Sequence, residues 1–167
     1  SAASDVYKRQ ALSNEKFEKI KSQVQKFVNE EMVPHEQDFN VNHKFADHLT
    51  FLEEKRNLVR NMGLFAPQIS KEHGGLGLSL HQLGQIYEIL GRTFYGLYVF
   101  NCQAPDAGNM EILIEHGTDY QKQTFLNPLI DGKIRSCFSM TEPEFAGSNP
   151  VITVSYTHLR AHETMVD

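Results

Sequence analysis

The sequence contains no tryptophan, and it has only two cysteines, Cys102 and Cys137, among 167 residues. They form no C-x-x-C pair, so they are typical of reduced, buried thiols in an intracellular protein. The sequence leaves a disulfide between them open, because a disulfide depends on geometry that no spacing fixes. We expect both thiols to be reduced and buried.

The sequence also lacks a long apolar run and an excess of positive charge. No stretch reaches the roughly 18 apolar residues that a membrane-spanning helix needs. Acidic residues outnumber basic residues by 21 to 16, which gives a net charge of −5 and disfavours binding to nucleic acid or to an anionic membrane. We expect a soluble, intracellular protein, and composition does not distinguish the cytoplasm, the mitochondrion and the peroxisome.

The two ends of the chain are predicted to be translated adapter DNA. The codons GAT GTG TAT AAG AGA CAG encode the opening segment DVYKRQ, and their reverse complement, read in a shifted frame, encodes TVSYTH near the other end. One oligonucleotide and its complement therefore account for both ends, and both match common sequencing-library adapters. We interpret residues 1–10 and 153–167 as adapter rather than as a basic targeting segment and a polar tail.

Apolar residues at steps of three and four predict that residues 11–133 form an all-α bundle. The first helix should begin at Ser13 or Asn14 and end near Pro34. Its inward stripe is predicted to consist of Phe17, Ile20, Val24, Phe27, Val28 and Met32. The second helix, over 51–63, should end at Gly63. Its inward residues are predicted to be Phe51, Leu52, Leu58, Val59 and Met62.

Three more helices are predicted from their start signals. Ser79 with Gln82, and Thr118 with Gln121, have the spacing of capping boxes. The segment 105–117 is predicted to form a helix. It has proline at the first helical position, an acidic residue in the positive first turn and Gly117 after the helix end. The acidic residue, Asp106, is explained by that first turn without a catalytic role.

The spacing of the apolar residues then ceases to be helical, and RSCFSM at 135–140 is predicted to be a strand. A strand needs a partner, so residues 134–152 are interpreted as the start of a further domain. Strands and helices do not alternate, which disfavours a doubly wound fold.

GGLG at 74–77 is interpreted as a tight turn rather than a phosphate-binding nest. The scattered histidines predict no metal site.

The loop MTEPEFAGSN at 140–149 carries the strongest chemical signal. It presents the hydroxyls of Thr141 and Ser148 and backbone N–H groups around 146–148, which suits a polar or anionic ligand. Glu142 and Glu144 are two residues apart and would diverge in an extended chain. A paired acid–base dyad is therefore not expected there.

Three segments in order resemble the acyl-CoA dehydrogenases: GLFAPQISKEHGGLGLS, LGRTFYGLYVFNCQAPDAGNMEILIEHGT and QKQTFLNPLIDGKIRSCFSMTEPEFAGSN. The FNC-APD-GNME and MTEP motifs are similar to a branch that in some eukaryotes is fused to a phosphotransferase-like domain. The resemblance implies an α-helical N-terminal domain, here 11–133, followed by the first strand and loop of a middle β-barrel. It also implies a C-terminal helical bundle beyond this chain, and a homo-oligomer for the complete protein.

The resemblance further implies FAD as cofactor, an acyl-CoA substrate, and an electron-transfer flavoprotein or similar acceptor in fatty acid metabolism. The cofactor-binding positions that it implies are Phe138, Met140, Thr141, Gly147 and Ser148. The last of these, Ser148, is also the expected substrate contact. No catalytic base is assigned, because the family's glutamate usually lies in the C-terminal domain, and this chain alone is predicted to be inactive.

Two other interpretations remain at this point: a flavin-dependent oxidase of the same fold, and a non-catalytic helical interaction module. Asn149 stands where the family usually has Asp, and Phe145 lies beside an additional residue. The barrel strand that carries a W-x-T flavin contact is missing. A bare interaction module has no use for the MTEP loop and the Gly-Ser turn, which disfavours that class.

Overall fold

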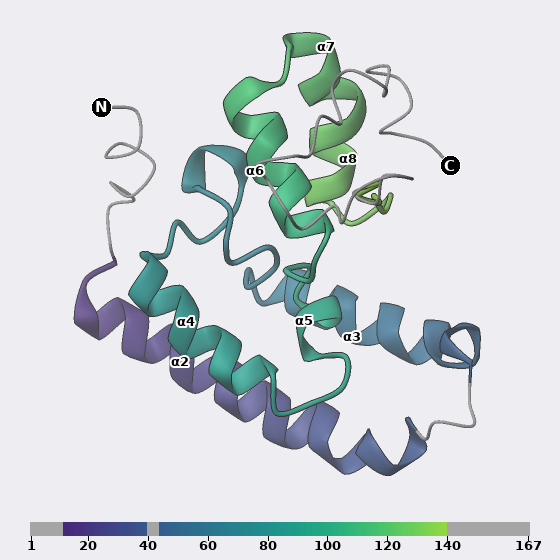
Figure 1. Ribbon diagram of the computed structural model, residues 1–167. Coiled ribbons are helices and arrows are strands. Elements are labelled where there is room, and N and C mark those ends of the chain that lie inside the picture. The colour runs from purple at the N-terminus through teal and green to yellow at the C-terminus, as the bar shows by residue number, and fades with distance from the viewer. Residues whose placement is uncertain (1–11, 40–43, 140–167) are drawn as a thin grey trace, which may run out of the picture. The chain divides into compact units, whose positions relative to one another are not determined.

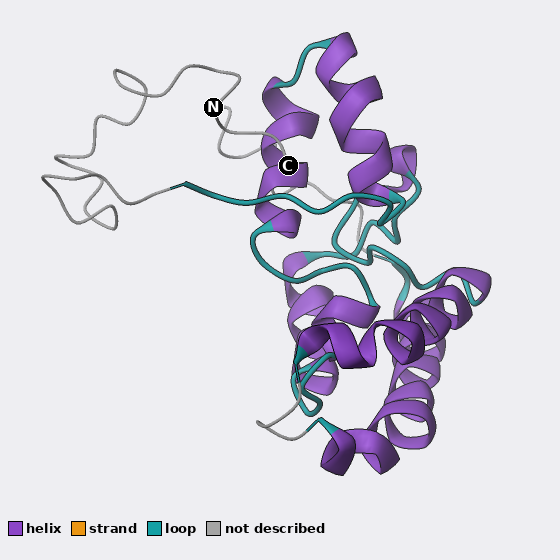
Figure 2. Cartoon of the chain, turned by 90° about the vertical axis from the view of Figure 1, so that its right-hand side faces the viewer, coloured by secondary structure: helices purple, strands orange, loops and turns teal. Residues whose placement is uncertain are grey.

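The computed structural model describes residues 12–39 and 44–139, and within these ranges the chain forms helices and loops without a β-strand (Figures 1 and 2). The prediction of an all-α chain is confirmed for this part. Residues 135–139, the described part of the predicted strand, have no regular secondary structure. Strand hydrogen bonds need a neighbouring strand, and no described segment supplies one.

The chain divides into two compact units, one ending at Gln103 and the other beginning at Ala104. The first unit opens with one continuous helical run: α2 (Asn14–Phe27), the π-helical η1 (Val28–Met32) and the 3-10 helix η2 (Val33–Asp38). The predicted inward stripe is confirmed, with Ile20 partly buried and the other members buried. Pro34 does not end the run, because it lies in the first turn of η2, where its missing N–H is tolerated.

The short 3-10 helix η3 (Phe45–His48) leads into α3 (Leu49–Asn61), where the sequence prediction was partly wrong. Leu58 and Met62 are 38% and 41% exposed, although both were predicted to point inward. The buried face of α3 instead carries Lys55 and Arg56 together with two apolar residues, Leu52 and Val59. Positions 52, 56 and 59 share one helical face, so turning that face inward leaves 58 and 62 outside.

Arg56 is fully buried and is surrounded by partners. Its guanidinium donates hydrogen bonds to the carbonyl oxygen of Tyr98 and, at 3.4 Å, to Oδ1 of Asn101. Its Nε lies 3.2 Å from a carboxylate oxygen of Glu53. The guanidinium also lies over the rings of Tyr98, at 4.5 Å, and Phe65, at 5.0 Å. These contacts offset the cost of placing a charge in the interior.

Lys55 is the second cation on this face. Its Nζ donates a 2.8 Å hydrogen bond to Glu31 in η1, and it lies 3.5 Å from Glu54. Burial alone would lower the pKa of Lys55, but the hydrogen bond and charge of Glu31 and the charge of Glu54 outweigh it, so the pKa is raised. The amine therefore stays charged and joins α3 to η1.

The predicted capping box at the start of α4 (Leu80–Leu90) is confirmed. Ser79 Oγ accepts a hydrogen bond from the amide nitrogen of Gln82 at 3.3 Å, and the Gln82 side chain accepts one from the amide nitrogen of Ser79 at 3.1 Å. The same glutamine amide bonds both the N–H and the carbonyl of Leu12, ahead of α2. Figure 1 shows α2 and α4 side by side, as this link requires.

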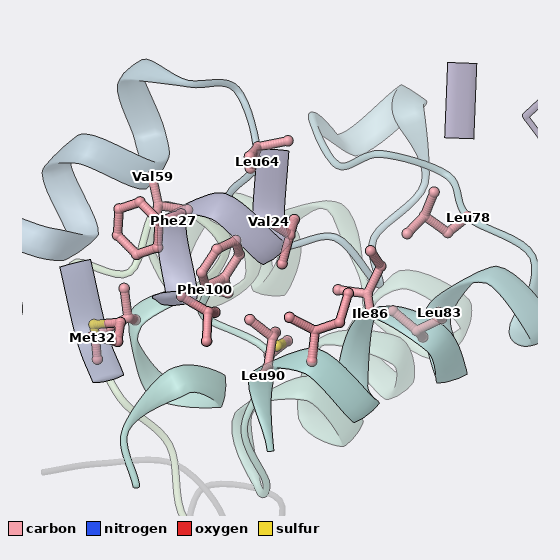
Figure 3. Close-up of a cluster of buried hydrophobic side chains, with 14 of the residues drawn as sticks. Val24, Phe27, Met32, Val59, Leu64, Leu78, Leu83, Ile86, Leu90 and Phe100 are labelled. Carbon is pink, nitrogen blue, oxygen red and sulfur yellow. The ribbon is translucent and has the colours of Figure 1, made fainter. Parts of the chain in front are cut away.

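The core of the first unit lies between α2, α3 and α4 (Figure 3). The rings of Phe27 and Phe100 meet edge to face with their centroids 5.5 Å apart. Burying each large apolar side chain stabilises the fold by about 1.5–3 kcal/mol. The short helix α5 (Gly96–Val99), which the sequence did not predict, places Phe100 in this core.

The GGLG segment follows the 3-10 helix η4 (Lys71–His73) and forms a turn, as predicted. The amides of Gly74, Gly75 and Gly77 donate to the carbonyls of Lys71, Ser70 and Ile69 at 2.9–3.1 Å. Gly74 and Gly77 have φ of +86° and +61°, which favours glycine. Because these donors already bond the chain, they do not form a nest for phosphate.

The second unit contains α6 (Asp106–His116), α7 (Asp119–Gln121), the π-helical η5 (Lys122–Leu126) and α8 (Asn127–Ile130). The last three form one continuous run, and its predicted capping box, Thr118 with Gln121, is confirmed. Contacts of α6 with η5 and α8 bury the unit's apolar side chains. These are Met110, Leu113, Leu126, Leu129 and Ile130.

Across residues 12–39 and 44–139, the helices are too short or too polar to span a bilayer.

We expect opposite effects from alanine at two glycines of the first unit. A Cβ at Gly75 would lie 2.2 Å from the carbonyl oxygen of Ile69, so Gly75→Ala should lower the free energy of unfolding by about 1–3 kcal/mol. Gly84 is exposed within α4, and a Cβ added there would meet no atom within 4 Å, so Gly84→Ala should raise it by about 0.5–1 kcal/mol. Urea unfolding followed by circular dichroism measures both, and equal effects would contradict the packing at Gly75.

Candidate functional site

The predicted site begins at Phe138, the only one of its five residues that the described part of the chain includes. Met140, Thr141, Gly147 and Ser148 lie outside the described residues. Phe138 is 58% exposed, and Ser139 beside it is also exposed. The described part of the site is therefore a loop segment, 134–139, that presents an aromatic ring to solvent.

A helix stop at the end of α8 starts this segment. Gly132 has a φ of +68°, and its amide donates to the carbonyl of Leu129 at 3.0 Å. The amide of Lys133 donates to the carbonyl of Pro128 at 2.9 Å. This pair of bonds is the Schellman motif, which favours glycine at the left-handed position. The sequence Asp-Gly-Lys after NPLI thus ends the helix and redirects the chain.

Asp106, the first residue of α6, binds the segment through its carboxylate. Its Oδ2 accepts a 2.6 Å hydrogen bond from Nε of Arg135, with which it forms an ion pair. Its Oδ1 accepts from the amide nitrogen of Ser136 at 2.8 Å and from the hydroxyl of Ser136 at 2.7 Å. The Asp106 side chain is fully buried, so these donors replace the water that an ionised carboxylate would otherwise bind.

Asn109 lies three residues further along α6, on the same face of the helix. Its Nδ2 donates to the hydroxyl of Ser136 at 2.8 Å and to the carbonyl of Cys137 at 3.1 Å. The Ser136 hydroxyl therefore accepts from Asn109 while it donates to Asp106. We call this set of bonds, from Asp106 and Asn109 to residues 135–137, the α6 clamp.

Sequence reasoning did not find the α6 clamp. It explained Asp106 by its place in a first helical turn, which is where the residue lies, but that explanation omitted the partners at 135 and 136. Two signals were available: the i, i+3 spacing of Asp106 and Asn109, and an arginine directly ahead of the site loop. Neither signal pairs the two segments, because they are about thirty residues apart.

The two cysteines differ, and the expectation that both are buried is wrong for Cys137. Both are free thiols, with Cys102 buried in the first unit and Cys137 exposed in the site segment. Burial raises the pKa of the Cys102 thiol, which makes its reactive thiolate scarcer. The backbone carbonyl of Cys137 accepts a hydrogen bond from Asn109, while its thiol is exposed.

No cluster of three or more histidine, cysteine, aspartate or glutamate side chains suited to a metal ion occurs in the ranges 12–39 and 44–139. Polar groups of Arg135, Ser136 and Cys137 instead bond Asp106 and Asn109 of α6. What this geometry offers chemically is a fixed backbone with an exposed aromatic ring at its end.

Residues 14–133 match the family model described as acyl-CoA dehydrogenase, N-terminal domain. Acyl-CoA dehydrogenase family member 10 of Mus musculus is 36% identical over 139 residues, which are 78% of this chain and 13% of that protein. Acyl-CoA dehydrogenase family member 11 of Gallus gallus is 45% identical over 101 residues, which are 59% of this chain and 12% of that protein. A solved structure from Mycobacterium abscessus, described as an acyl-CoA dehydrogenase, aligns with a TM-score of 0.71 at 32% identity, over 83% of this chain and 37% of that one.

We expect a thiol-alkylating reagent to modify Cys137 rapidly in the folded chain and Cys102 only slowly. Cys102 is 4% exposed and has a raised pKa, so its reaction must wait for local opening. Peptide mass spectrometry over time measures both rates. Cys137→Ser should leave no rapid phase, and denaturant should make the two rates similar. Equal rates in the native chain would contradict the burial of Cys102.

Proposed function

The chain belongs to the acyl-CoA dehydrogenase family, and we propose that it forms the N-terminal helical part of an FAD-dependent enzyme that oxidises the α,β C–C bond of an acyl-CoA thioester. The observation that carries this proposal is the match of the family's N-terminal domain over 14–133, directly ahead of the MTEP loop. The chain spans 12–13% of the two curated relatives described above. Substrate, cofactor and partners are therefore proposals about the complete protein.

The described residues fit a flavin at the start of the loop. The ring of Phe138 is exposed and flat, and the backbone before it is fixed by hydrogen bonds, so the ring can lie along a second planar aromatic system without first being ordered. When bound, FAD would supply an acceptor for the hydride from the β-carbon of the substrate. Phe138 and Met140 would lie along the isoalloxazine ring, and Thr141 would hydrogen-bond it.

Gly147 and Ser148 would form the turn beside the FAD phosphates and the acyl-CoA thioester. A glycine lets the backbone approach a bulky anion closely, and a serine hydroxyl beside it can donate a hydrogen bond. We assign Ser148 the substrate contact.

Removal of the α-proton requires a base that this chain does not supply in our proposal. Glu142 and Glu144 belong to the loop itself and are not assigned that role. We place the base in the C-terminal domain of the complete enzyme. An electron-transfer flavoprotein or similar acceptor would reoxidise the cofactor, and the complete enzyme would be a homo-oligomer.

In the complete protein, Ser148→Ala should weaken the binding of acyl-CoA or FAD by about fivefold with little effect on folding. Loss of one neutral hydrogen bond costs about 1 kcal/mol, which corresponds to this factor. Calorimetric titration with acyl-CoA and with FAD measures the two affinities. Ser22→Ala, at an exposed position of α2, is the matched control. Unchanged affinities for both ligands would remove Ser148 from the site.

The 167-residue chain alone should not oxidise any acyl-CoA, because the proposed base lies outside it. The assay follows reduction of an artificial electron acceptor with added FAD and acyl-CoA substrates of several lengths. The complete protein is the positive control: it should be purified with flavin, and acyl-CoA should bleach the flavin colour. Turnover by the chain alone would contradict the placement of the base, whereas a complete protein without flavin would refute the proposed function.

A further inference from the structure

The α6 clamp fixes three successive residues through both their backbone and their side chains. It binds the side chain of Arg135, the amide and hydroxyl of Ser136, and the carbonyl of Cys137. Contacts to both backbone and side chains restrict the φ and ψ angles of this stretch. Phe138 follows directly, so the direction in which the chain enters the proposed flavin loop is set by α6.

Burial of Asp106 favours the complete set of clamp hydrogen bonds over a partial set. The Asp106 side chain has no exposed surface, while that of Arg135 is 45% exposed. A buried carboxylate that lost its donors would remain without water, so the arrangement with all donors in place is strongly preferred over partial ones. Asn109 adds a second anchor through the Ser136 hydroxyl, which links the two α6 side chains into one network.

Such preorganisation matters for a planar cofactor. Ordering a residue costs conformational entropy, and a segment that is already ordered spares that cost when a ligand binds. The clamp is built on a helix, and helices hold site residues more rigidly than loops do. Its effect on the flavin would therefore pass through the backbone of 135–137 and not through contact.

We propose that Asp106 and Asn109 are positioning residues that orient Phe138 towards the flavin. The proposal rests on the proposed function, because it presumes that FAD binds this loop. It differs from a purely stabilising role for the clamp, which would leave the environment of the flavin unchanged as long as the protein stays folded.

The first test measures the clamp in the 167-residue chain without any cofactor. Hydrogen exchange of the Ser136 amide should be slow in the unsubstituted chain and about ten- to a hundredfold faster in Asp106→Asn, because an amide offers one acceptor oxygen and no charge for Arg135. The matched control is Asp119→Asn, which changes an exposed aspartate in the first turn of α7. Equal Ser136 exchange in both variants would overturn the proposal.

The second test measures the flavin in the complete protein. Asp106→Asn should raise the dissociation constant for FAD about tenfold. It should also change the visible absorption and reduction potential of the flavin at saturating FAD, where Asp119→Asn should change neither. Asn109→Ala removes the second anchor while keeping a good helix former, so it tests the same idea if Asp106→Asn folds poorly. It should shift the same readouts to a smaller extent.

The two tests separate the possible failures. Faster Ser136 exchange with unchanged FAD affinity and spectrum would overturn the positioning role and leave a stabilising one. A complete protein of natural sequence that binds no FAD would refute the proposed function, and the positioning role with it, even if the exchange result confirmed the clamp. The Asp106→Asn, Arg135→Gln double variant tests whether the two residues act as a pair. If it changes the FAD affinity no more than either single variant does, the effect passes through this pair.

Discussion

The positions of the loops in the first unit depend on one constraint, the burial of the charged Arg56 guanidinium. Arg56 is fully buried, and each of its partners must lie within hydrogen-bond reach for the helix α3 to turn this face inward. The carbonyl of Tyr98 and the side chain of Asn101 therefore have fixed positions. Asn101 adopts a φ of +56°, a conformation that costs energy for most residues and that asparagine tolerates better than others.

The loop after α3 depends on the same segment. The amide of Ala66 donates to the carbonyl of Phe100 at 2.9 Å, and the Gln68 side chain donates to the carbonyl of Asn101 at 2.9 Å. Phe100 then lies in the apolar core against Phe27. One buried charge thus couples α3, the loop that follows it and the segment after α5, so polar satisfaction and apolar packing in this unit require one another.

The second unit uses a buried charge of opposite sign for a different purpose. Asp106 is as fully buried as Arg56, but its partners lie in the segment that leads to the proposed flavin loop and not between helices of a core. In the proposed enzyme, α6 would determine how the chain enters this loop, and the exposed Phe138 would be the first residue of the site.

The helices and their ends follow from local sequence, because they depend on residues three or four positions apart. The capping boxes at Ser79 and Thr118, the stop at Gly63 and the inward stripe of α2 were all predictable from spacing. The three segments that resemble the family, the MTEP loop among them, also identified the family that the comparisons show. The site residues after Ser139 lie outside the described part of the chain.

Tertiary packing selects which face of α3 points inward, and it favours the face with Arg56 over the one with Leu58 and Met62. Hydrophobicity alone places Leu58 and Met62 inward, since it does not count the carbonyl and amide oxygens that a distant segment supplies to Arg56. The partners of Asp106 and the exposure of Cys137 were hidden for the same reason. A local pattern fixes the period of a helix, but the free energy of burying a polar group depends on atoms that only folding brings near.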